Sequence, residues 1–137
     1  MILPNIENFI GCDSSFEEAE IVLYGAPFDS TTSFRPGVRF GPSAIRHESF
    51  GLETYSPYQD RDLMDIRVFD SGDLELCFGS SEKALADIQD RAEEILKEGK
   101  WPLLLGGEHL VTLAAVRAAA RRIFRDFILF ILMPTQI

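Results

Sequence analysis

Short apolar runs alternate with helix-like segments along this chain, and this alternation restricts the possible folds more than any other feature. The runs are Ile21–Tyr24, Ile66–Phe69 and Trp101–Leu105. A short continuous run such as the first is typical of a strand that is buried on both faces of a parallel sheet. Repetition of strand, loop and helix therefore predicts an α/β fold with a mostly parallel sheet.

The segments between the runs have helical features. Gly41-Pro42-Ser43 is a predicted helix start, because proline is tolerated in the first turn of a helix. An Ala-rich helix is predicted over Leu110–Arg122. The strongest prediction is a helix over Ser81–Glu98, which ends before a capping glycine at Gly99. Its apolar residues recur every three or four positions and form one stripe, which consists of Leu85, Ile88, Ala92, Ile95 and Leu96.

Composition excludes several classes of protein. The 137 residues carry 22 acidic and 13 basic side chains, so the net charge of -9 argues against nucleic-acid binding. No run reaches the ~20 apolar residues of a membrane-spanning helix, and the first residues do not resemble a signal peptide. Cys12 and Cys77 do not form a disulfide framework. We therefore expect a cytoplasmic protein with reduced cysteines and no membrane partner.

A long polar segment, residues 25–46, follows the first predicted strand. In open α/β sheets, ligands bind beyond the carboxyl ends of the strands, which is where this segment lies. Asp29 is either a ligand-binding residue or an acceptor that holds the loop in shape. Arg35, Arg39 and Arg46 either bind an anion or pair with the many carboxylates of the chain.

A second polar segment, Gly106-Gly107-Glu108-His109, follows the third predicted strand. Its glycines allow another part of the chain or a ligand to approach the backbone closely. A neutral imidazole at His109 is either a metal ligand or a hydrogen-bonded structural residue. One histidine does not hold a transition metal tightly, and His47 is predicted to lie on a helix surface.

Three motifs together resemble the ureohydrolase (arginase/agmatinase) family. The segment Gly-Ala-Pro-Phe-Asp-Ser-Thr-Thr-Ser-Phe-Arg-Pro-Gly-Val-Arg-Phe-Gly-Pro-Ser-Ala-Ile-Arg, residues 25–46, resembles the N-terminal loop of its agmatine-cleaving members. The segments 68–73, Val-Phe-Asp-Ser-Gly-Asp, and 104–109, Leu-Leu-Gly-Gly-Glu-His, follow in the family's order. The long loop is the specific signal, because Gly-Gly-Glu-His alone would be weak.

The resemblance implies a three-layer α/β/α fold and a pair of manganese ions bridged by hydroxide. In that family the hydroxide attacks a guanidinium carbon, so that agmatine gives urea and putrescine, a step of polyamine biosynthesis. His109 falls on a family manganese ligand, and the family is commonly oligomeric. Asp29, Arg35, Arg39 and Glu108 become candidates for the substrate loop or for its support. Guanidinobutyrate and guanidinopropionate are alternative substrates.

Other family motifs are missing. The remaining ligands come from Asp-Ala-His-x-Asp and Asp-x-Asp motifs, which this sequence lacks, so one manganese ligand and no catalytic residue are assigned. We expect residues 1–122 to form the first half of an arginase-like domain, truncated before the rest. We expect the apolar tail, residues 123–137, to be frameshifted. A one-base shift can turn Ile131–Ile137 into His-Phe-Asp-Ala-His-Thr-Asp, the missing motif.

Two functional expectations follow from these departures. The chain as written is expected to lack guanidine hydrolysis and tight manganese binding, because most ligands are absent. The alternative to an enzyme is a non-catalytic fragment, a pseudogene product or a subunit-interaction module. Poor solubility is also expected, because an incomplete sheet leaves an open apolar edge.

Overall fold

Three parallel strands form the centre of the protein, in the order β4-β1-β5. The computed structural model describes residue 2 and residues 7–122, so the predicted tail 123–137 lies outside the described part. The strands are β1 (Ile21–Ala26), β4 (Val68–Asp73) and β5 (Trp101–Gly106). The predicted α/β fold with a parallel sheet is confirmed.

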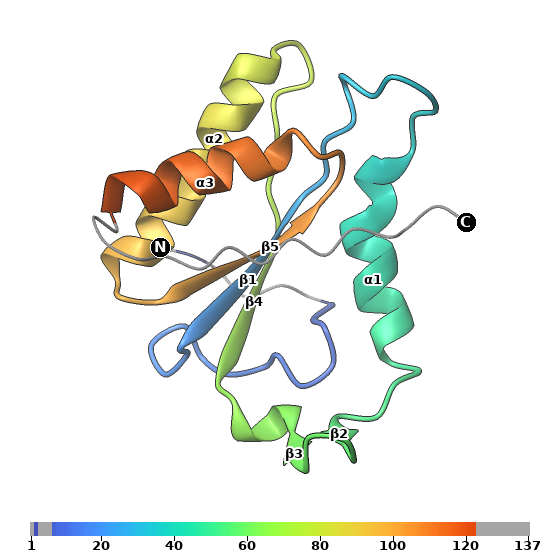
Figure 1. Cartoon of the computed structure of the whole chain (residues 1–137), viewed down its shortest axis with the longest axis vertical. Helices are drawn as coiled ribbons and strands as arrows, with labels where there is room; N and C mark the ends of the chain where they lie inside the picture. The colour runs from blue at the N-terminus through green and yellow to red at the C-terminus, as the bar shows by residue number, and fades with distance from the viewer. Residues whose placement is uncertain (1, 3–6, 123–137) are drawn as a thin grey trace.

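Helices cover both faces of this sheet. The helices α2 (Ser81–Lys97) and α3 (Val111–Arg122) pack together on one face, and α1 (Gly41–Ser49) lies on the other (Figure 1). The strand β1 is central, so its side chains enter both layers. Val22 and Tyr24 pack in the core under α2 and α3, whereas Leu23 packs with Val68 and Cys12 in a smaller cluster. All three β1 residues are buried, as predicted for a two-sided strand.

The structure corrects the prediction for β4. The sequence suggested a strand over Ile66–Phe69 and a turn at Ser71-Gly72-Asp73, but the strand continues through Asp73. A register shift lets Gly25 of β1 pair with Asp73, and Gly72 has a φ of 74°. Glycine tolerates this left-handed conformation, so the turn-like residues form an irregularity inside the strand instead of ending it.

The strand β5 is less buried than a two-sided strand should be. Trp101 and Leu103 point to the α1 side and are 63% and 49% exposed, although their partners on β1 are Ile21 and Leu23. Within the described part of the chain, β5 is an edge strand that pairs only with β1. Among the described residues, the α1 side of β5 is therefore partly open, whereas Phe9 and Cys12 pack against the same side of β1 and β4.

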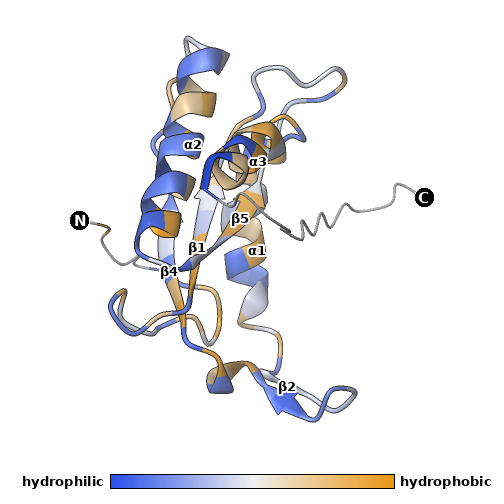
Figure 2. Cartoon of the chain, turned by 60° about the vertical axis from the view of Figure 1, so that its left-hand side comes forward, coloured by the Kyte–Doolittle hydropathy of each residue, from blue (hydrophilic) through white to orange (hydrophobic). Residues whose placement is uncertain are grey.

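The helices follow the predicted periodicity closely. On α2 the buried residues are Ala84, Ile88, Ala92 and Ile95, and Leu85 and Leu96 pack partly buried against the same core. The hydroxyl of Ser80 accepts a hydrogen bond from the Lys83 backbone N–H at 3.3 Å, which caps the start of the helix. Figure 2 shows the result, with hydrophilic residues along much of α2.

Smaller elements connect α1 to β4. A two-stranded antiparallel ribbon, β2 (Tyr55–Ser56) and β3 (Arg61–Asp62), follows α1. The 3-10 turn η2 (Leu63–Asp65) follows this ribbon and precedes β4, and another 3-10 turn, η1 (Val38–Phe40), lies before α1. In the described ranges, no helix combines the length and the hydropathy needed to cross a membrane.

Candidate functional site

The turn after β5 lies directly beside the loop after β1. The backbone N–H of Gly107 donates to the Ala26 carbonyl at 3.0 Å, and the N–H of Glu108 donates to the Phe28 carbonyl at 2.8 Å. A Cβ atom at Gly107 would lie 2.1 Å from the Phe28 carbonyl oxygen. Only glycine fits this contact, so the close backbone approach expected at this turn is made to the chain itself.

Glu108 connects the same turn to Thr31. Its Oε1 atom accepts hydrogen bonds from the Thr31 backbone N–H at 3.1 Å and from the Thr31 hydroxyl at 2.6 Å. The second distance lies in the range of charge-assisted hydrogen bonds between a hydroxyl and a carboxylate. Glu108 was predicted as a candidate for loop support, but its partner Thr31 was not identified from the sequence.

Asp29 holds together the two ends of the loop that contains Thr31. The residue is only 6% exposed, and its Oδ2 atom accepts from the Gly37 backbone N–H at 2.7 Å and from Arg39 Nε at 3.1 Å. The hydrogen bond from Gly37 lowers the pKa of Asp29 below its ordinary value, and the nearby Arg39 lowers it further. The sequence left two roles open for Asp29, a ligand-binding residue or an acceptor that holds the loop in shape. These contacts agree with the second role.

The arginines of this segment have different environments. Arg39 pairs with Asp29 and lies 5.8 Å from the ring centres of Phe40 and Phe78. Arg35 lies over the Phe34 ring at 5.2 Å. Arg46 is buried, and it pairs with the carboxylates of two aspartates on β4. Arg39 and Arg46 thus pair with carboxylates, whereas Arg35 contacts an aromatic ring and lines a groove.

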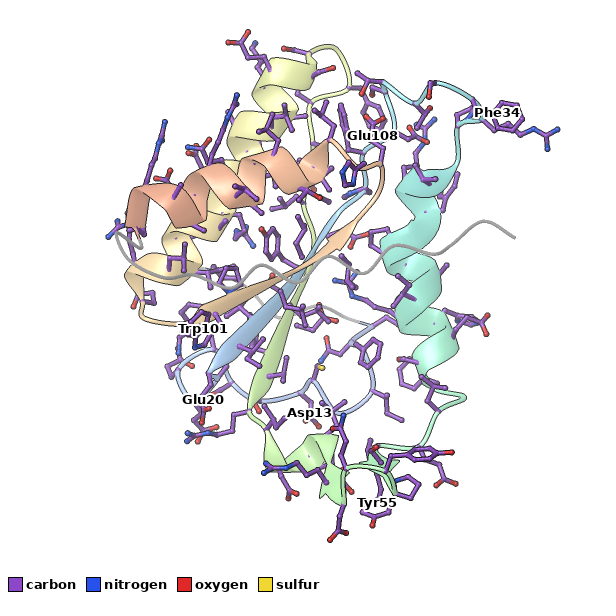
Figure 3. The ribbon with its side chains drawn as sticks, viewed as in Figure 1. Asp13, Glu20, Phe34, Tyr55, Trp101 and Glu108 are labelled. Atoms are coloured by element: carbon purple, nitrogen blue, oxygen red, sulfur yellow. The ribbon has the colours of Figure 1, made fainter. Side chains whose placement is uncertain are left out.

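The loop, the start of α1 and the turn after β5 surround an open groove of about 870 Å³. Its lining consists of loop residues 31–38 and Phe40, of Gly41 and Ala44 at the start of α1, and of Glu108, His109 and Leu110 in the turn after β5. Figure 3 shows Phe34 at the outer tip of the loop and Glu108 where the loop meets the sheet. The groove lies at the carboxyl ends of β1 and β5, where ligands bind in α/β sheets.

His109 lines this groove and is exposed. His47 lies on α1 with 76% of its side chain exposed, beside Glu7, as predicted for a surface residue. In the part of the chain that the structure describes, no three His, Cys, Asp or Glu side chains are grouped to hold a metal ion. The described residues therefore do not by themselves fit a manganese pair, since His109 is a single candidate ligand.

A buried polar cluster joins α1 to β4, and the sequence predicted only part of it: Arg46 was a candidate to pair with carboxylates, but its partners were not identified. Arg46 of α1 pairs with Asp70 and Asp73 of β4, and the Ser43 hydroxyl donates to Asp73 at 3.3 Å. The cluster attaches α1 to the end of β4, and Gly41 at the start of α1 lies against the Gly106 carbonyl of β5. An arginine three residues after Ser43 was visible in the sequence, but its partners depend on how α1 packs on the sheet.

A parallel sheet with a groove at the carboxyl ends of its strands is the arrangement of ligand-binding α/β domains. A sequence profile of the arginase family matches residues 19–132, well over half of the chain. The chain belongs to the arginase family. The matched range includes the first residues of segment 123–137, and the frameshift expected there stays a prediction.

Curated relatives agree with this membership. An agmatinase from Bacillus anthracis is 50% identical over 114 residues, which cover 83% of this chain and 39% of the relative. An N(1)-aminopropylagmatine ureohydrolase from Thermococcus kodakarensis is 40% identical over 104 residues, which cover 74% of this chain and 36% of the relative. The chain thus spans less than two fifths of the length of these relatives.

Solved structures have the same fold. The agmatine ureohydrolase of Thermoplasma volcanium superposes with a TM-score of 0.78 at 33% identity, over 83% of this chain and 39% of that one. A variant of Trypanosoma cruzi formiminoglutamase, solved with Mn²⁺, gives a TM-score of 0.70 at 26% identity, over 80% of this chain and 37% of that one. The arginase-like fold expected from the sequence is confirmed.

Proposed function

We propose that this chain forms the groove-bearing part of a manganese-dependent ureohydrolase of the agmatinase type, which cleaves agmatine to urea and putrescine. One observation carries the proposal: the long loop that resembles agmatinases and the turn that bears His109 line the same groove. The 50% identity to a curated agmatinase supports the choice of agmatine. Guanidinobutyrate and guanidinopropionate are the alternative substrates.

His109 is the proposed manganese ligand of this part of the protein. A manganese pair, when bound, would supply a hydroxide near neutral pH for attack on the guanidinium carbon. Glu108 and Asp29 are assigned to support of the loop, because their carboxylates accept hydrogen bonds from it. The chain's own residues would shape the groove, bind the substrate and exclude water, and the other metal ligands would come from outside the described residues.

A chimera tests this proposal. Residues 19–122 would replace the matching part of the Bacillus anthracis agmatinase, and release of urea from agmatine would be measured with added Mn²⁺. We expect an active chimera in which His109→Ala lowers the rate by ~100-fold or more, because a metal ligand is lost. The matched control His47→Ala removes an exposed imidazole from α1 and should keep the rate. An active His109→Ala chimera would contradict the ligand role.

The chain as written is proposed to be inactive, because the described residues supply a single candidate ligand. Its alternative role is that of a non-catalytic fragment or a subunit-interaction module. Incubation of the purified 137-residue chain with agmatine and Mn²⁺ should release no urea, and urea release above a no-protein control would overturn this statement.

We further propose a cytoplasmic protein without a nucleic-acid partner, and a homo-oligomer for the complete family protein but not for this fragment. The two cysteines, Cys12 and Cys77, are free thiols, which agrees with a reducing compartment. The net charge of -9 opposes binding to phosphate backbones. Light scattering of the complete protein would check the oligomeric state, and a nucleic-acid shift assay would check the absence of nucleic-acid binding.

A further inference from the structure

The loop that walls the groove, residues 30–38 (the groove loop), is held at two separate places. Asp29 accepts hydrogen bonds from Gly37 and Arg39, so it joins the two ends of the loop. These contacts lie within one short stretch of sequence. They fix the shape of the groove loop but not its distance from β5.

Glu108 supplies a side-chain contact between the groove loop and the turn after β5. Its carboxylate binds both the N–H and the hydroxyl of Thr31, a residue 77 positions earlier in the chain. The Glu108 backbone N–H is itself bound to the Phe28 carbonyl, so the carboxylate starts from a fixed position. A hydroxyl bound to a carboxylate at 2.6 Å is a strong hydrogen bond, and this one joins the loop to the turn after β5.

His109 follows Glu108 directly, and both residues line the groove. We propose that Glu108 is a positioning residue: through Thr31 it sets the distance between the groove loop and His109, and so the width of the groove. The positioning stands on the contacts alone. Its effect on a guanidino substrate rests on the proposed function.

Hydrogen exchange of the full chain, measured by mass spectrometry, tests the positioning. Glu108→Ala removes the carboxylate, Thr31→Val removes the hydroxyl, and Thr31→Ser restores it. We expect exchange of residues 30–38 to accelerate by ~10-fold or more in the first two variants, because a hydrogen bond to a charged group is lost. Thr31→Ser should exchange like the wild type.

The matched control is Glu93→Ala. Glu93 also accepts two side-chain hydrogen bonds, from Gln89 at 2.8 Å and Arg121 at 3.0 Å, but it joins α2 to α3. This variant should leave the groove loop unchanged. Unchanged loop exchange in Glu108→Ala, or equal acceleration in β1 and α2, would overturn the proposal. If Glu108→Ala does not fold, Thr31→Val against Thr31→Ser decides it.

A kinetic measurement separates this proposal from the proposed function. In an active chimera, Glu108→Ala should raise KM for agmatine by ~10-fold while kcat changes less, because the groove loop is displaced and the chemistry is not. A fall in kcat at constant KM would overturn the effect on substrate. An inactive chimera with accelerated loop exchange would refute the proposed function and leave the positioning role supported.

Discussion

The guanidinium of Arg46 and the carboxylate of Asp70 form a fork of two hydrogen bonds between α1 and β4. Nε lies 2.8 Å from Oδ2 and Nη2 lies 2.9 Å from Oδ1, and the two side chains are 3% and 0% exposed. The backbone N–H of Phe9 also donates to Asp70. Burial lowers the pKa of Arg46, but its hydrogen bonds to Asp70 and Asp73 outweigh this effect and raise it, so Arg46 stays charged.

Removing one member of this pair should destabilise the protein strongly. Arg46→Met leaves Asp70 buried without its cation, and we expect a loss of ~3–5 kcal/mol in the free energy of unfolding, measured by urea denaturation. The control Arg67→Met breaks an exposed ion pair with Glu20 and should lose less than ~1 kcal/mol. Equal losses in the two variants would show that the buried pair has no special role.

The contact between Gly107 and Phe28 gives a second prediction. In Gly107→Ala the new methyl group must displace the Phe28 backbone, so we expect a loss of ~1–3 kcal/mol and a disturbed groove loop. Gly79→Ala is the matched control, since no atom lies within 4 Å of a Cβ there. Thermal unfolding of both variants checks the prediction, and an unaltered Gly107→Ala midpoint would contradict it.

Asp29 should make stability depend on acid pH. Its folded-state pKa is lower than the ordinary value of 3.8, chiefly because of the hydrogen bond from Gly37. The stability that the ionised Asp29 carboxylate contributes is therefore fully present above its ordinary pKa. It is lost as the pH falls through the lower folded-state pKa. Asp29→Asn should flatten the acid limb of a plot of unfolding free energy against pH. Asp87→Asn, on the exposed side of α2, is the control for the change in charge.

The sequence predicted the order of strands and helices well because local signals determine them. The apolar run of β1, the stripe of α2 and Pro42 in the first turn of α1 each act within a few residues. The groove contacts were not predictable in this way. Glu108 and Thr31 meet only because β1 and β5 are neighbours in the sheet, and no local pattern encodes that pairing. His109 was found by its place after a strand, whereas its exposure depends on the surrounding loops.

The open side of β5 should promote self-association. Trp101 and Leu103 expose apolar surface next to a strand edge that is unpaired among the described residues, and such edges pair with other chains. We expect Leu103→Lys to lower the apparent mass in concentration-dependent light scattering, because a charge on an edge strand opposes pairing. Tyr58→Lys is the control, since this side chain is 99% exposed but lies between β2 and β3. An equal effect in the two variants would point to net charge instead of the β5 surface.

The frameshift predicted for residues 123–137 can be tested on the gene. The codons ATT TTG ATG CCC ACA CAG AT can encode Ile131–Ile137, and with the last base of a TTC codon for Phe130 they would read CAT TTT GAT GCC CAC ACA GAT. This is His-Phe-Asp-Ala-His-Thr-Asp, which would add the metal ligands that His109 lacks among the described residues. We expect resequencing across codons 115 to 140 to show these bases, with the shift between about Ala120 and Phe124. A gene in which other codons encode this segment would refute the frameshift, because no one-base shift would then recover the motif.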